Sequence, residues 1–85
     1  MPKNRISANG KIPPPSRKDM ISVLQLDGFT PERTPGDHLV FKKDDMIVQV
    51  DMGRISEQLG QDSFHLIMAR ARMSRERYVA LLKRL

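Results

Sequence analysis

The side chains of this sequence that could move a proton near neutral pH are its two histidines, because the chain contains no cysteine. His38 lies in the run DHLVFKK, directly after Pro35-Gly36. Alternate residues of a β-strand share a face, which groups His38 with Lys42. An imidazole can accept or donate a proton, and an ammonium group can stabilise charge on a phosphate. The spacing therefore favours acid–base chemistry on an anionic substrate, the alternative being an incidental surface histidine.

A three-stranded antiparallel sheet is predicted to position this pair. Residues 37–43 and 46–52 are rich in β-forming side chains and are separated by Asp44-Asp45, a pattern typical of a hairpin. A short extended segment that begins at Phe29 is interrupted by prolines and is expected at the sheet edge. One face of the hairpin is apolar and should cover the core, which leaves the histidine and the lysine facing water. That apolar face comprises Leu39, Phe41, Met46, Val48 and Val50.

Three helices are predicted around the sheet, one before it and two after it. Ser16 can cap the first helix, and Gly28 can end it in the left-handed conformation. Ser63 and Ser74 are the expected caps of the two later helices, the first of which carries His65 at its surface. The order α-β-β-β-α-α defines an α+β domain whose helices cover one face of the sheet.

Charge and composition divide the chain. Residues 1–18 carry five basic side chains and no acidic one, whereas residues 19–69 carry four basic and nine acidic ones and residues 70–85 carry six basic and one acidic one. Basic ends suit a polyanionic partner, the alternative being a solvated tail and a solvated helix face. Its prolines and turn signals indicate that segment 1–15 is a flexible, basic, proline-rich extension to a domain at residues 16–85.

The composition also excludes several classes of protein. No apolar run reaches the roughly 20 residues that span a bilayer, and the first residues lack the hydrophobic stretch of a secretory signal. Two histidines without cysteine do not make a usual zinc site, so neither a metal nor a small-molecule cofactor is expected. A cytoplasmic protein without membrane contact is therefore expected.

Four motifs follow one another between residues 18 and 80. The first is the helix that runs into Gly28-Phe29, and the second is the strand GDHLVF at residues 36–41. The third is IVQV at residues 47–50, and the fourth is SFHLIMARARMSRE at residues 63–76. In this order they resemble the opening helix with its "GF" junction, the Gly-Ser-His-x-x-Phe strand, the third strand and the "TLRSILKQAGLSREE" ending of the HicA-type toxins of bacterial and archaeal toxin–antitoxin pairs.

The resemblance implies a fold like that of double-stranded-RNA-binding domains and cleavage of mRNA that is independent of the ribosome. It also implies a protein partner, a cognate HicB-type antitoxin that covers the active face. The catalytic histidine of the family corresponds to His38, and its active-site turn corresponds to Gly36 and Asp37. The chain is therefore expected to be the toxin of a type II pair and an mRNA endoribonuclease.

Three positions depart from the family pattern. Asp37 replaces a serine beside the histidine, and its carboxylate would stabilise a charged imidazole but repel phosphate. Arg72 stands where the family has a helix-ending glycine, so the break between the last two helices is expected to be less sharp. Asp51-Met52 replaces a proline and a histidine that often follow the third strand.

With a single candidate histidine and no cysteine, the expected chemistry is metal-independent cleavage by the 2′-hydroxyl of the RNA itself. His38 would act as general base on that hydroxyl or as general acid on the 5′-oxygen. Lys42 and Lys43 are expected to stabilise phosphate charge, and Arg33 and Lys18 could extend the RNA-binding track. The alternative for each of the four is a solvated side chain, which is slightly favoured for Arg33 and Lys18.

Two other functions stay open on sequence alone. The same fold could hold structured RNA through phosphates and 2′-hydroxyls without cutting it. The domain could instead bind only another protein, in which case its basic ends would serve solubility. DNA binding is less favoured, because the sequence shows no helix-turn-helix recognition pattern.

Overall fold

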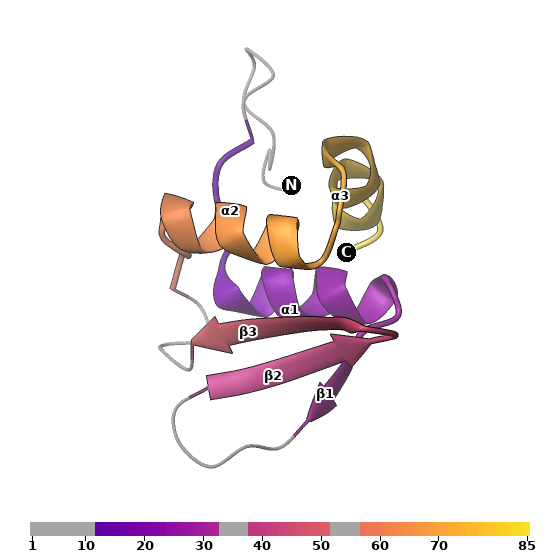
Figure 1. The fold of residues 1–85 in the computed structure, drawn as a ribbon. Coiled ribbons are helices and arrows are strands. Elements are labelled where there is room, and N and C mark those ends of the chain that lie inside the picture. The colour runs from indigo at the N-terminus through magenta and orange to yellow at the C-terminus, as the bar shows by residue number, and fades with distance from the viewer. Residues whose placement is uncertain (1–11, 33–37, 52–56) are drawn as a thin grey trace.

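Three helices and three strands follow one another in the predicted order. In the computed structural model they are α1 (Arg17–Leu26), β1 (Thr30–Glu32), β2 (His38–Lys43), β3 (Met46–Asp51), α2 (Gln61–Arg70) and α3 (Arg75–Leu82). The structure describes residues 12–32, 38–51 and 57–85. The strands form one antiparallel sheet in the order β1-β2-β3, and the helices lie on one side of it (Figure 1). The predicted α+β architecture is confirmed.

Helix α1 begins and ends where its sequence signals predicted. Ser16 is the N-cap, and its side-chain oxygen accepts a hydrogen bond of 3.1 Å from the amide of Asp19. After the helix, Gly28 adopts φ +98°, and the amides of Gly28 and Phe29 donate to carbonyls of the last turn. This pair of bonds is the Schellman motif, in which a left-handed residue ends a helix. The side chains that α1 buries are Met20, Val23 and Leu24.

The β2–β3 hairpin has the register that its two-residue turn requires. Lys43 pairs with Met46, and Asp44 lies in the turn with φ +53°, a conformation that aspartate tolerates. β1 contains a proline and pairs only with β2, at one edge of the sheet, as predicted. The hairpin side chains that are buried against the helices are Phe41, Val48 and Val50.

The last two helices begin in different ways. Ser74 caps α3 as predicted, because its side-chain oxygen accepts a 3.1 Å hydrogen bond from a first-turn amide. The prediction that Ser63 caps α2 is wrong. The N-cap is Gly60, which supplies no side-chain bond, and its carbonyl already accepts from the amide of Phe64 at 3.0 Å. Ser63 therefore lies inside the first turn.

The break between α2 and α3 is sharp, which corrects the expectation drawn from Arg72. Arg72 adopts φ +50°, and the amides of Arg72 and Met73 donate to α2 in the same Schellman pattern that follows α1. Its guanidinium also lies 3.4 Å from the carboxylate of Asp45 in the hairpin turn. Arginine therefore fills a position where glycine is usual, at the cost of left-handed strain.

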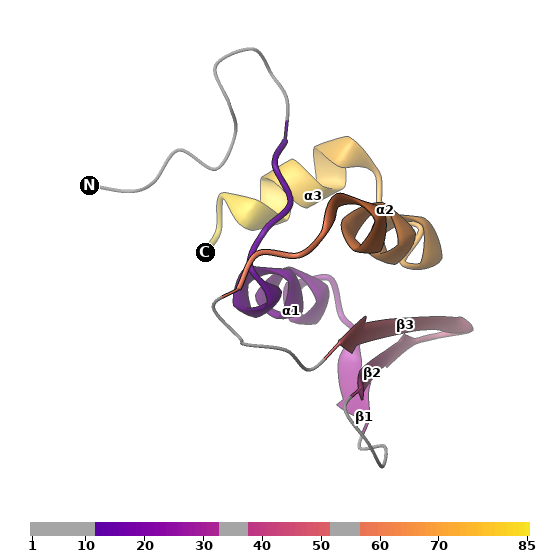
Figure 2. The same ribbon diagram turned by 90° about the vertical axis from the view of Figure 1, so that its left-hand side faces the viewer.

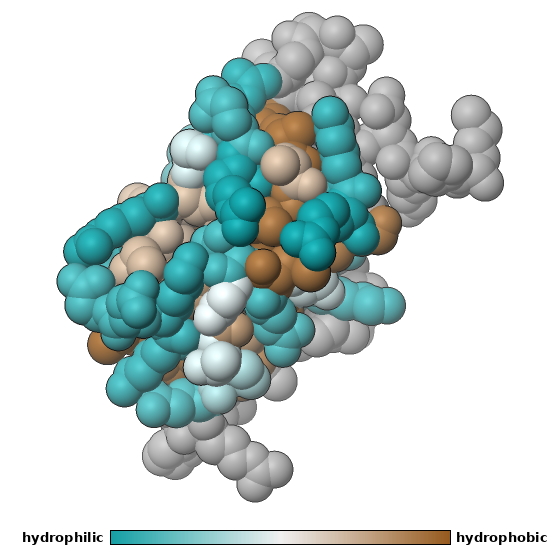
Figure 3. Space-filling model, turned by 90° about the vertical axis from the view of Figure 1, so that its right-hand side faces the viewer, coloured by the Kyte–Doolittle hydropathy of each residue, from teal (hydrophilic) through white to brown (hydrophobic). Residues whose placement is uncertain are grey.

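The core lies between the inner face of the sheet and the three helices. α2 contacts β3, and α1 contacts both β1 and α3. The rings of Phe64 and Tyr78, with centroids 5.1 Å apart, join α2 to α3. No charged residue is buried among residues 12–32, 39–50 and 57–85. Seen from the side of the hairpin turn and α3, the surface is mostly hydrophilic, with hydrophobic side chains between the polar ones (Figure 3).

Residues 12–15, the described end of the expected extension, contact the domain. The carbonyl of Pro15 accepts from the amide of Leu59 at 2.8 Å, and the carbonyl of Pro14 accepts from the side chain of Gln58 at 2.7 Å. Ser16 forms an antiparallel bridge with Gln58. From this attachment the segment runs away from the sheet, on the side of the helices (Figures 1 and 2).

Candidate functional site

The outer face of the sheet, which we define as the face turned away from the helices, carries the polar residues of the strands. Lys42, Ile47 and Gln49 are exposed there, whereas Phe41 and Val48 between them are buried. Lys42 therefore faces water, as the strand alternation predicted. Residues paired across strands share a face. One row of this face comprises Thr30, Lys42 and Ile47, and the next comprises Glu32, Val40 and Gln49.

His38 begins β2 and stands opposite Asp51 of β3 in the strand register. The side chains of both residues lie outside what the structure describes, and so do Arg33, Gly36 and Asp37. The catalytic role of His38 and the active-site turn thus stay predictions. The register does identify a carboxylate-bearing residue across from the histidine, which sequence reasoning missed. The sequence alone could have identified Asp51, because pairing residues outward from the two-residue turn at Asp44-Asp45 places it opposite His38.

Lys42 is accessible although it already has a partner. Its Nζ lies 3.2 Å from the carboxylate of Glu32 on β1, and the two side chains are 46% and 52% exposed. Exposed ion pairs of this kind contribute little to stability, so Lys42 could exchange Glu32 for a phosphate at small cost. Glu32 was not recognised from the sequence, and it reduces the positive charge of this face.

Lys43 belongs to a different surface. Its Nζ lies 3.6 Å from the carboxylate of Asp27, which also accepts a 2.9 Å hydrogen bond from Nε of Arg77. The Asp27 side chain is only 9% exposed, and Lys43 Nζ lies 5.7 Å from the centroid of the Phe29 ring. Lys43 and Arg77 thus neutralise a nearly buried carboxylate and connect β2 and α3 to the end of α1. The structure does not bring Lys43 to the face of Lys42.

Lys18 lies in the layer of helices. It is exposed in the first turn of α1 and forms no ion pair with the residues that the structure describes. An RNA strand that contacts both Lys18 and Lys42 would have to pass around the edge of the sheet. Of the three predicted RNA-binding side chains that the structure describes, only Lys42 therefore lies on the outer face.

Comparison of the chain with models of protein families, with curated proteins and with solved structures found no match. The likeness to HicA-type toxins therefore depends on the sequence motifs. No helix of the described residues is long and apolar enough to cross a bilayer. Within the same part of the chain, no three His, Asp or Glu side chains are grouped as metal ligands.

Proposed function

We propose that this domain is an mRNA endoribonuclease, the toxin of a type II toxin–antitoxin pair, with His38 as its catalytic residue. The observation that carries the proposal is the position of His38 at the start of β2, in a GDHLVF motif on the same sheet as the exposed Lys42. A polyanion lying along the outer face would meet both residues. The proposed location is the cytoplasm, where mRNA is present.

In the proposed reaction, the 2′-oxygen of a ribose attacks the adjacent phosphorus, and the bond from phosphorus to the 5′-oxygen breaks. The products are a 2′,3′-cyclic phosphate and a 5′-hydroxyl. His38 removes the proton of the 2′-hydroxyl or donates a proton to the 5′-oxygen. A single histidine serves one of these transfers and leaves the other to water, so turnover is expected to be slow.

Lys42 is proposed to bind RNA and not to take part in the reaction. It lies four residues from His38 on the same strand, which corresponds to roughly 13 Å at the rise of a β-strand. At that separation its ammonium group would contact a phosphate further along the RNA and not the phosphate that is being cleaved. Removal of Lys42 should therefore weaken binding more than it slows the chemical step.

The test compares the parent, His38→Ala and His65→Ala on the same RNA in EDTA. His65 is the matched control because it is the other histidine and is exposed on α2. The parent and His65→Ala should leave cyclic-phosphate ends, His38→Ala should leave RNA intact, and DNA of the same sequence should survive because it lacks the nucleophile. Equal cleavage by His38→Ala would overturn the assignment. Equal binding without products from any of the three would support a non-catalytic RNA-binding module instead.

The proposal includes a protein partner, a HicB-type antitoxin that covers the outer face. A neighbouring reading frame should encode a small acidic protein with a DNA-binding end. Its addition should stop RNA cleavage and should protect backbone amides of β2 from hydrogen exchange. Inhibition without such protection would contradict the proposed binding face.

A further inference from the structure

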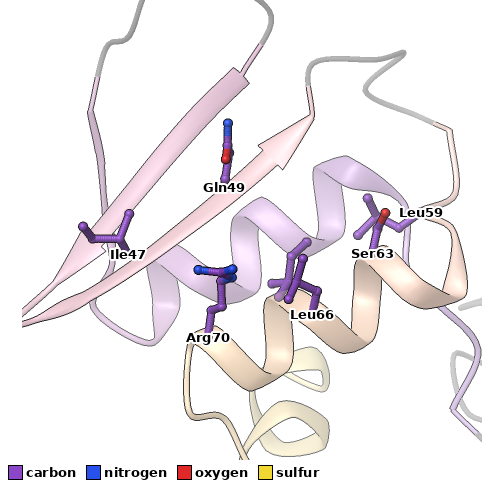
Figure 4. A pocket seen from close by; sticks show the side chains of 7 residues that line it. Ile47, Gln49, Leu59, Ser63, Leu66 and Arg70 are labelled. Carbon is purple, nitrogen blue, oxygen red and sulfur yellow. The ribbon is translucent and has the colours of Figure 1, made fainter.

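A groove lies between β3 and α2 (Figure 4). It has a volume of about 250 Å³, and β3 is an edge strand that pairs with β2 on one side only. Residues from β3, from α2 and from the segment before α2 line it, so the fold brings together two segments that are distant in sequence. These residues include Ile47, Gln49, Leu59, Ser63, Leu66 and Arg70.

The walls of this groove are exposed apolar side chains. Ile47 on β3 is 53% exposed, and Leu66 on α2 is 54% exposed. The buried side chains of Leu59 and Ile67, each 4% exposed, continue this apolar surface into the core. The core does not require Ile47 and Leu66, since both point outward. Apolar surface that remains exposed and is bordered by polar groups marks an interaction site.

The charge of the groove comes from one residue. Arg70, in the last turn of α2, extends beside the groove (Figure 4). It forms no ion pair with the residues that the structure describes, and the other lining residues are uncharged. The positive charge of Arg70 would thus be complemented by a carboxylate of whatever covers the groove.

The size and composition of the groove favour a protein segment over RNA or a small molecule. Its volume of about 250 Å³ lies below the roughly 300–1,000 Å³ of typical small-molecule sites. No aromatic side chain lines it on which a base could stack. In contrast, arginine is enriched at protein interfaces, and the fully buried centre of such an interface is largely apolar.

We propose that this groove docks a short segment of a partner protein that combines one apolar side chain with one carboxylate. The apolar side chain inserts between Ile47 and Leu66, and the carboxylate pairs with Arg70. The inference does not require the proposed nuclease activity, because none of its residues takes part in that reaction. It assigns an interaction surface at the border of the outer face, where Ile47 stands opposite Lys42.

The test selects binders from a displayed library of random peptides on the full chain, with counter-selection on Leu66→Glu. Recovered peptides should share an acidic and an aliphatic or aromatic residue at a fixed offset. Arg70→Glu should weaken their binding about tenfold, as the reversal of one charge pair predicts. Arg84→Glu is the matched control, since it makes the same charge change at an exposed position that does not line the groove. Its effect should stay below about twofold.

Backbone NMR shifts on adding a selected peptide locate the binding site. Shifts confined to β3 and α2, lost in Ile47→Thr, support the proposal, and this variant retains a β-branched residue in the strand. The proposal is overturned if no peptide depends on Leu66, if the shifts map elsewhere, or if Arg70→Glu and Arg84→Glu behave alike. It is also overturned if an oligouridylate shifts the amide signals of β3 and α2 and no peptide does.

Discussion

Gly28 and Arg72 occupy the same position in two copies of one helix-ending motif. Each has positive φ, +98° for Gly28 and +50° for Arg72, and in each the residue and its successor donate amides back to the helix. Glycine adopts this conformation freely, whereas the Cβ of an arginine crowds the backbone. The ion pair of Arg72 with Asp45 offsets little of that strain, because both side chains are more than two-thirds exposed, at 68% and 73%.

Arg72→Gly should therefore stabilise the domain. Relief of left-handed strain contributes about 1 kcal/mol, and the greater freedom of glycine in the unfolded chain removes part of this, so about 0.5 kcal/mol should remain. The reciprocal change, Gly28→Ala, should lower the free energy of unfolding by about 1 kcal/mol. Urea unfolding of the two variants checks both signs. A destabilised Arg72→Gly would show that the Asp45 pair matters more than the strain.

Asp27→Asn should destabilise the domain more than Asp45→Asn. The nearly buried Asp27 carboxylate bonds Arg77 and lies beside Lys43, and hydrogen bonds to charged groups contribute about 1.5–3 kcal/mol each. We expect a loss of about 1–2 kcal/mol, since both cations regain water when the charge is removed. Asp45→Asn, which removes an exposed pair, should change the free energy by less than about 0.5 kcal/mol. Equal losses in urea unfolding would contradict the bridging role of Asp27.

If the RNA lies on the outer face, Lys42→Gln should weaken RNA binding and leave stability nearly unchanged, whereas Lys43→Gln should lower stability and leave the salt dependence of binding unchanged. Lys42→Gln should lower RNA affinity and reduce the slope of log K against log salt by about 0.7, with little change in stability. Lys43→Gln should leave that slope unchanged and lower the urea midpoint, because it removes a cation from Asp27. Binding isotherms at several salt concentrations, with urea unfolding of the same samples, separate the two. Equal slopes for the two variants would exclude this surface as the RNA-binding face.

The features that were predicted correctly depend on short-range signals. Ser16 and Ser74 cap their helices by accepting hydrogen bonds from amides three residues further on. Asp44 and Asp45 form the two-residue turn, and this turn fixes the register between β2 and β3. Alternation along β2 and β3 then decides which side chains enter the core. Each of these signals lies within one turn or one strand pair, so a local pattern was sufficient to find it.

The features that were missed depend on contacts between distant segments. The bond between Arg77 and Asp27 joins residues 50 positions apart, and no local pattern distinguishes Arg77 from the other arginines near it. The ion pair of Lys43 with Asp27 was missed for the same reason, since it joins β2 to the end of α1. Gly60 was missed as a cap because the register of α2 is set by the burial of Phe64 and Ile67, not by a capping side chain.

The attachment of residues 14–16 to residues 58–59 has a practical consequence for measurement. The described segment before α1 leads away from the strands, on the side of the helices. A biotin tag joined ahead of residue 12 would therefore be attached on the side of the molecule opposite the outer face of the sheet. Immobilising the protein on a sensor chip through that tag would then leave the outer face of the sheet presented to the flowing sample.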